Sequence, residues 1–132
     1  MFLTTLARSA ALGVGSIALV ATSATAASAD AYAPYAQAAA HVSSNGTLLK
    51  SKNIDNVTWS GGGVYCVHVS DPRIDLSESV FTATLGRFAS RGGTVQVSMG
   101  RSECGNDPRT IPVISGDTNG NFAPNEFYLT IQ

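Results

Sequence analysis

The stretch from residue 61 to residue 70, GGGVYCVHVS, constrains the fold of this chain more than any other. It opens with three glycines, and glycine adopts the positive φ angles of a sharp reversal at little cost. A run of β-branched and aromatic residues follows, which favours a β-strand. That run holds Cys66, and the second of the two cysteines, Cys104, lies far downstream. We therefore expect a central strand that a disulfide ties to a distant part of the fold.

The N-terminus has the three parts of a secretory signal peptide. Arg8 supplies a positive charge, residues 10–21 form an apolar run, and residues 27–29 read Ala-Ser-Ala, a cleavage signal. A membrane anchor is the alternative, but the apolar run falls short of the roughly 20 residues that span a bilayer. We expect residues 1–29 to be a signal peptide that is cleaved after Ala29. The mature chain would then be secreted, without stable insertion into a membrane.

The remaining chain, about 100 residues, has the length of one domain. We expect residues 30–37 to be a flexible leader and residues 38–132 to form the folded domain. A domain of this size buries only about two-thirds of its unfolded surface. A Cys66–Cys104 disulfide would therefore matter, since closing such a loop stabilises a fold by roughly 4 kcal/mol. Two free thiols or a pair of metal ligands are the alternatives.

Short alternating segments separated by turn residues predict an all-β fold. Asn45-Gly46 is a strong hairpin signal, and Val95, Val97 and Met99 alternate with polar residues so that they face inward. Pro112 would confine its strand to a sheet edge. The expected strands cover residues 38–43, 47–51, 53–59, 64–70, 79–85, 94–99, 111–114 and 126–131. The pattern predicts one small antiparallel β-sandwich, or a partly open barrel, of seven or eight strands with one disulfide.

Charge in this chain is low and evenly mixed. The formal net charge is −1, and acidic and basic residues are interspersed. Nucleic-acid binding depends on a clustered basic surface, and binding to a membrane surface through charge depends on a polybasic run. The sequence has neither, so we expect no nucleic-acid partner.

The residues that carry chemistry are few. His41 and His68 are the only histidines, each lies in an expected strand, and no metal-ligand spacing surrounds them. The sequence also lacks the Gly-x-Ser-x-Gly turn that presents a nucleophilic serine. We assign no catalytic, cofactor-binding or metal-binding residues and expect a protein that is not an enzyme. A small hydrolase with a site around His41 or His68 is the alternative.

Two polar loops are the expected binding surfaces, because rigid β-scaffolds commonly bind through loops. Within residues 117–121 oxygen-bearing side chains alternate as in a calcium loop, but Phe122 stands where that loop needs glycine and Tyr128 where it needs glutamate. A polar turn explains the same residues. The candidate binding residues in the loops 103–109 and 115–125 are Asn106, Asp107, Arg109, Asp117, Asn119 and Asn121.

Residues 57–69, with Gly63, Tyr65 and Val67 in a Gly-x-Tyr-x-Val motif, resemble a known pattern. The segment is similar to small uncharacterised secreted actinobacterial proteins and to β-rich modules at the ends of phage-tail and collagen-like proteins. Residues 40–49 resemble the hairpin that opens such modules. The resemblance implies an all-β extracellular domain without established catalytic residues. Phage-tail relatives form trimers, but this chain lacks their repetitive stalk. A homo-oligomer is therefore kept as an alternative to a single chain.

Together these features predict a secreted, non-enzymatic β-domain that acts as a binding or surface-interaction module. Its partner would be an extracellular protein or glycan. A secreted enzyme inhibitor that uses the same two loops is an alternative, as is the small hydrolase.

Overall fold

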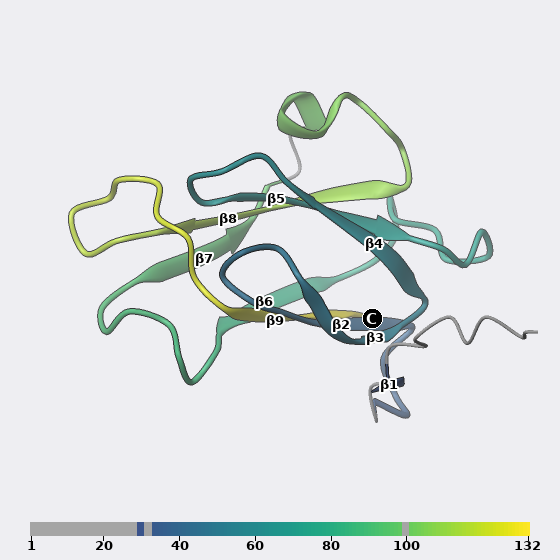
Figure 1. Cartoon of the computed structure of the whole chain (residues 1–132). Coiled ribbons are helices and arrows are strands. Elements are labelled where there is room, and N and C mark those ends of the chain that lie inside the picture. The colour runs from purple at the N-terminus through teal and green to yellow at the C-terminus, as the bar shows by residue number, and fades with distance from the viewer. Residues whose placement is uncertain (1–28, 31–32, 99–100) are drawn as a thin grey trace, which may run out of the picture.

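The computed structural model describes residues 29–30, 33–98 and 101–132, and it contains two β-sheets packed face to face (Figure 1). The first, the β2 sheet, has the order β1-β3-β2-β9-β6. Its strands are β1 (Ala29–Asp30), β2 (Ala38–Val42), β3 (Leu48–Lys52), β6 (Phe81–Leu85) and β9 (Phe127–Ile131). All its pairings are antiparallel except that of β1 with β3.

The second sheet, the β5 sheet, is antiparallel throughout and has the order β4-β5-β8-β7. Its strands are β4 (Ile54–Trp59), β5 (Val64–Val69), β7 (Thr94–Val97) and β8 (Thr110–Gly116), and a 3₁₀ helix, η1 (Arg101–Cys104), precedes β8. The disulfide joins Cys66 to Cys104. The predicted all-β sandwich with one disulfide is therefore confirmed. Residues 1–28 of the expected signal peptide lie outside the described residues, as does Met99.

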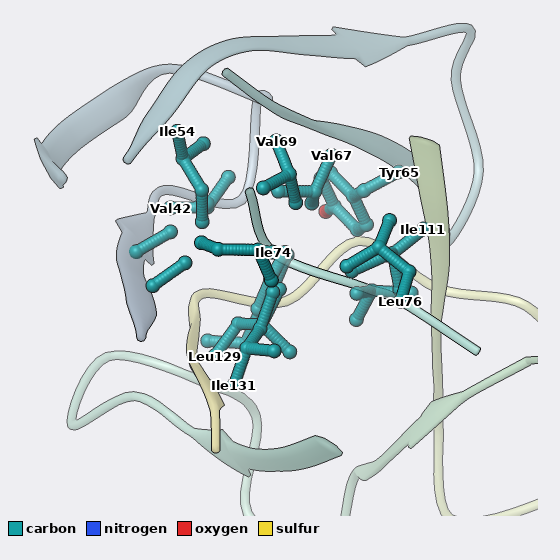
Figure 2. Close-up of a cluster of buried hydrophobic side chains, with 14 residues drawn as sticks. Val42, Ile54, Tyr65, Val67, Val69, Ile74, Leu76, Ile111, Leu129 and Ile131 are labelled. Carbon is teal, nitrogen blue, oxygen red and sulfur yellow. The ribbon is translucent and has the colours of Figure 1, made fainter. Parts of the chain in front are cut away.

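The core lies between the sheets, where strict alternation along β5 and β9 supplies its largest fully buried side chains (Figure 2). Tyr65, Val67 and Val69 point inward from β5, and Phe127, Leu129 and Ile131 point inward from β9. The Tyr65 hydroxyl donates to the carbonyl oxygen of Ser44 at 2.6 Å, so the largest buried side chain has its polar end satisfied. Val95 and Val97 also face the core, as the alternation predicts, and are half-buried.

The hairpin predicted at Asn45-Gly46 is confirmed. Ser43 N–H donates to the Thr47 carbonyl at 2.9 Å across the turn, and Gly46 has a φ of 82°. A Cβ at residue 46 would lie 2.4 Å from the Cβ of Trp59, so the position also needs glycine for space. The single tryptophan therefore packs against the hairpin, with its indole N–H donating to the Gly62 carbonyl at 3.1 Å.

The prediction that residues 111–114 form a short edge strand is wrong. β8 has seven residues and lies between β5 and β7. Ser115 N–H donates to the Gly63 carbonyl, so residues an even number away from Ser115 bond to β5, and the nitrogen of Pro112 faces the β7 side. There Ser98, just past the end of β7, donates to the Pro112 carbonyl at 2.9 Å. The missing proline N–H thus falls where the β7 ladder already ends, which is why a central strand tolerates it.

A β-bulge at the start of β4 changes which side chains reach the outer face of the β5 sheet. Ile54 pairs with Val69 and Asn56 pairs with His68, so Asp55 is an extra residue in β4. A bulge turns an additional side chain away from the regular alternation. Here it brings the Asp55 carboxylate to His68 on the outer face of the sheet.

Candidate functional site

The outer face of the β5 sheet gathers polar side chains from three neighbouring strands. Along β5, Cys66 and His68 alternate with the buried core residues and so face outward. On β4, Thr58 pairs with Cys66 and Asn56 pairs with His68. On β8, Thr110 pairs with His68. Register alone therefore places an amide, two hydroxyls and an imidazole side by side.

A hollow of about 350 Å³ lies over these residues. The Cys66–Cys104 disulfide holds η1 against β5, so η1 and the loop after it form one wall. The lining residues are Asn56, Thr58, Ser60, Cys66, His68, Glu103, Cys104, Asp107 and Thr110. Small-molecule sites commonly have volumes of about 300–1,000 Å³, so the hollow suits one small ligand or one unit of a larger one.

His68 is held between two carboxylates. Its Nδ1 lies 2.6 Å from Asp55 Oδ1, and its Nε2 lies 3.9 Å from Asp107 Oδ2. The first contact is a hydrogen bond that fixes the orientation of the imidazole. The second is longer than a hydrogen bond. Nε2 of His68 therefore faces Asp107 but makes no hydrogen bond to it.

Asp107 is itself fixed by its own loop. Arg109 N–H donates to Asp107 Oδ1 at 2.9 Å, and the Thr110 hydroxyl donates to Oδ2 at 2.7 Å. The bond from the Arg109 backbone has the largest effect and the bond from the Thr110 hydroxyl the next largest. Together they hold the pKa of the Asp107 carboxyl below its usual value. Asp107 is therefore a fixed negative charge at the edge of the hollow.

The lining of the hollow indicates what it can bind. Its described side chains offer hydroxyl, amide, imidazole and carboxylate groups, and none of them is a lysine or an arginine. A phosphate or other anion would meet the negative charge of Glu103 and Asp107. A neutral ligand rich in hydroxyl groups, by contrast, could both donate to the carboxylates and accept from the hydroxyls and the amide.

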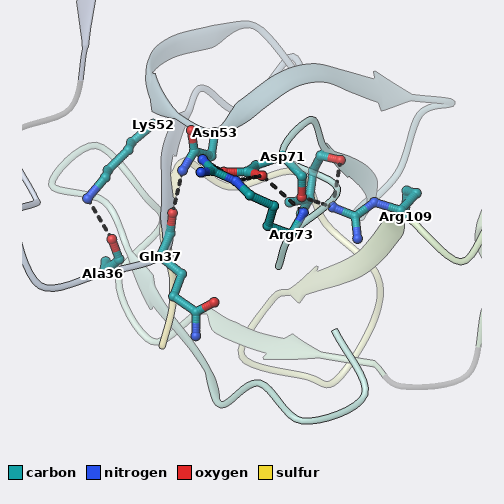
Figure 3. A network of polar contacts seen from close by, with 8 residues as sticks. Ala36, Gln37, Lys52, Asn53, Asp71, Arg73 and Arg109 are labelled. Atoms are coloured by element: carbon teal, nitrogen blue, oxygen red, sulfur yellow. Dashed lines mark hydrogen bonds and ion pairs between the residues drawn. The ribbon is translucent and has the colours of Figure 1, made fainter. Parts of the chain in front are cut away.

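Arg109, a predicted binding residue, has a structural role (Figure 3). Its guanidinium donates to the carbonyl of Ile74 at 2.7 Å, to that of Val69 at 3.3 Å, and to that of Asp71. These bonds fasten the segment after β5 to the start of β8. Because the side chain is half-buried and its donors are engaged within the fold, Arg109 is poorly placed to contact a ligand.

The two predicted binding loops lie at opposite ends of β8, so the structure does not bring them together (Figure 1). The first loop contributes Asp107 to the hollow, and its Asn106 is exposed with a φ of 60°. In the second loop, Asp117 Oδ1 accepts N–H groups of Asn119 at 2.8 Å and Asn121 at 2.9 Å. This carboxylate thus closes its own turn, as the polar-turn interpretation of residues 117–121 predicts.

His41 lies on the other sheet and takes part in a different cluster. Its Nε2 lies 2.5 Å from Glu126 Oε1, and its ring stacks on Tyr128 with 4.3 Å between ring centres. Glu126 is buried, and its second oxygen accepts Phe88 N–H at 3.0 Å. This arrangement anchors a loop, and it shares no surface with His68.

Sequence reasoning named the disulfide and Asp107 but missed Asp55, Asn56 and Thr58. The alternation in residues 64–69 already places Cys66 and His68 on one face, so part of the signal was present. Asp55 could not be found this way, because the bulge that turns it toward His68 has no sequence signature of its own.

Within the described ranges 29–30, 33–98 and 101–132, no cluster of three or more His, Cys, Asp or Glu side chains is arranged to hold a metal ion. In the same ranges no helix has the length and apolar character that crossing a bilayer requires. The resemblance to secreted actinobacterial and phage-tail modules stays a prediction. Comparison with protein-family models, with curated proteins and with solved structures finds no match to this chain.

Proposed function

We propose that this protein is a secreted, non-enzymatic binding module that holds a small polyhydroxylated ligand, such as one sugar unit of a glycan, in the hollow on the β5 sheet. The observation that carries the proposal is His68, which Asp55 holds in place by a hydrogen bond, in a hollow of about 350 Å³ that is also lined by hydroxyl, amide and carboxylate groups. Hydroxyl-rich ligands bind through several directed hydrogen bonds, which need donors and acceptors that are already in position.

The scaffold supports such a role because the groups are placed by strands. Asn56, Thr58 and Thr110 are fixed by the register of β4 and β8 against β5. The disulfide also adds an apolar wall against which the C–H face of a sugar ring can pack. A disulfide is typical of oxidising compartments, which supports export of the chain.

The direct test is a binding screen of neutral, cationic and anionic sugars by NMR titration. We expect neutral or cationic sugars to shift the amide signals of residues 56–60 and 66–68. Replacing Thr58 with Val keeps the shape of the side chain but removes a hydroxyl from the hollow, and should weaken binding about fivefold to tenfold. Thr82→Val is the matched control, since Thr82 is an exposed strand residue on the β2 sheet.

Equal affinity of Thr58→Val and wild type would remove the hollow as the site.

A second candidate, a small hydrolase, is favoured by one contact, because Asp55 orients the imidazole of His68 as in a catalytic His–Asp pair. The same sugars, presented as oligomers, distinguish the two functions. Cleavage that is lost in His68→Asn would show an enzyme and contradict the binding module.

A further inference from the structure

Asn45 and Asn119 are the two asparagines in the chain that are followed directly by glycine. This dipeptide permits a reaction within the chain, in which the backbone nitrogen of the glycine attacks Cγ of the asparagine side chain. Glycine favours the attack because it has no Cβ to hinder the nitrogen and its backbone turns freely. Both asparagines are exposed and lie in turns, so sequence and exposure do not distinguish them. Their hydrogen bonds do distinguish them.

The carboxamide of Asn45 is held by its own hairpin. Its Oδ1 accepts the Thr47 N–H at 3.2 Å, the Thr47 hydroxyl at 2.8 Å, and the hydroxyl of Ser43. The N–H of Gly46 donates to the Ser43 carbonyl at 3.0 Å, and Gly46 is packed against Trp59. Bringing the carboxamide of Asn45 onto the Gly46 nitrogen therefore breaks several hydrogen bonds and opens the hairpin.

Asn119 lies in the turn between β8 and β9, and its carboxamide is not held in this way. Its backbone N–H donates to Asp117 Oδ1 at 2.8 Å, but its side chain makes no hydrogen bond to any residue that the structure describes. The Gly120 N–H donates to the Asp117 carbonyl at 3.3 Å, which is longer than a typical hydrogen bond. A Cβ at residue 120 would meet no atom within 4 Å, so the space around the nitrogen is open. The two reacting groups can therefore meet without the opening of a strand.

We propose that Asn119 is a site of spontaneous deamidation in the folded protein, whereas the hairpin protects Asn45. Hydroxide removes the proton of the Gly120 N–H, and the nitrogen then forms a bond to Cγ of Asn119. The Cγ–Nδ2 bond breaks, and the released nitrogen takes a proton from water and leaves as ammonia. Water then opens the cyclic imide at either carbonyl and leaves aspartate or isoaspartate. The net reaction consumes one water and releases one ammonia.

The reaction would change the turn that carries it. Either product places a second carboxylate beside that of Asp117, and like charges repel at this range. Isoaspartate also adds a carbon to the backbone, so the bond of 2.9 Å from Asn121 N–H to Asp117 Oδ1 would lengthen or break. The turn lies at the other end of β8 from Thr110, which lines the hollow. Deamidation at Asn119 is therefore independent of the function proposed for the hollow.

The test compares the two sites in the same molecule. Purified wild-type protein is incubated in mildly alkaline buffer, either folded or in concentrated urea, and aspartate and isoaspartate at each site are measured by peptide mass spectrometry. In the folded protein we expect Asn119 to react about tenfold faster than Asn45, because Asn45 must wait for the hairpin to open. In urea the two rates should become similar, since glycine follows both residues. A difference that persists unchanged in urea would show that the fold is not its cause and would overturn the proposal.

Variants check each half of the proposal. Ser43→Ala combined with Thr47→Val removes both hydroxyl donors to Asn45 Oδ1, and should raise the rate at Asn45 about threefold to tenfold without changing that at Asn119. Asn119→Gln lengthens the side chain and should remove the fast release of ammonia. Melting curves verify that these variants fold. Reaction at Asn45 as fast as at Asn119 in the folded wild type, an unchanged rate at Asn45 in the double variant, or wild-type release of ammonia from Asn119→Gln would overturn the proposal.

Discussion

Glu126 shows how one buried carboxylate can position a loop. Its two oxygens contact His41 on β2 and the backbone of residue 88, and its side chain lies against Gly86, where a Cβ would be 2.5 Å from Glu126 Cγ. A buried carboxylate is costly unless its hydrogen bonds are made. Here both oxygens have partners, so the same contacts that satisfy Glu126 also fix residues 86–88.

Replacing Glu126 with Gln tests this role at the scale of one residue. The amide keeps the shape of the side chain, but one end becomes a donor that faces either His41 or the N–H of residue 88. We expect the free energy of unfolding to fall by about 1–3 kcal/mol in urea denaturation. Glu78→Gln is the control, because Glu78 is exposed, and should leave stability unchanged. A loss of the same size in both variants would contradict a specific role for Glu126.

Among the strands, the pairing of β5 with β8 organises the β5 sheet. β5 places Tyr65, Val67 and Val69 in the core from its inner face, and Cys66 and His68 line the hollow from its outer face. Its entry at Gly63 is tight, since a Cβ there would lie 1.9 Å from the carbonyl oxygen of Ser115. The third glycine of the 61–63 run is therefore needed for close approach of two strands, which is a separate requirement from reversing the chain.

This distinction predicts different costs for two neighbouring substitutions. Gly63→Ala must push β5 away from β8 and should lower the free energy of unfolding by about 3 kcal/mol. Gly62→Ala has open space around it and meets only the strain of a φ of 64°, which costs about 1 kcal/mol. Guanidinium denaturation of both variants measures the difference. Equal losses would show that the glycines act only as a turn.

The elements differ in how far sequence alone could predict them. Alternation over residues 94–97 and 127–131 gave the correct inward faces, and Asn45-Gly46 gave the hairpin, because these signals are local. Pro112 led to the wrong prediction of an edge strand. Its missing N–H shows only that one side of the strand lacks a hydrogen bond at that residue, and it does not show where the strand on that side ends. The hollow was out of reach because Asp55, His68 and Asp107 meet only through strand register and a bulge.

At the scale of the whole molecule, the disulfide has two roles. Cys66 and Cys104 are 38 residues apart in sequence, and closing a loop of that length contributes about 4 kcal/mol in the chain-entropy model. Typical domains have a net stability of about 5–15 kcal/mol, so this is a large share for a chain of this size. The same bond holds η1 beside the hollow, which links global stability to the shape of the proposed binding site.

Acid should destabilise the molecule through several carboxylates that accept hydrogen bonds in the folded state. The Arg73 guanidinium and backbone N–H hold the pKa of Asp71 at about 2, against an ordinary value of 3.8. Hydrogen bonds also lower the pKa of Asp75, Asp107 and Asp117. A carboxyl with a lower pKa in the folded state stabilises the fold above its unfolded pKa, and that contribution is lost as pH falls through the folded pKa.

We therefore expect the melting temperature to fall as pH decreases from about 4 to about 2, with little change between pH 5 and 7. Asp71→Asn removes the group with the lowest pKa, and Arg73→Gln removes its principal partner. Both variants should melt at a lower temperature than wild type at pH 7 and show a shallower fall with acid. Differential scanning calorimetry across this range measures both slopes. If both variants kept the wild-type slope below pH 4, the Asp71–Arg73 pair would not contribute to acid sensitivity.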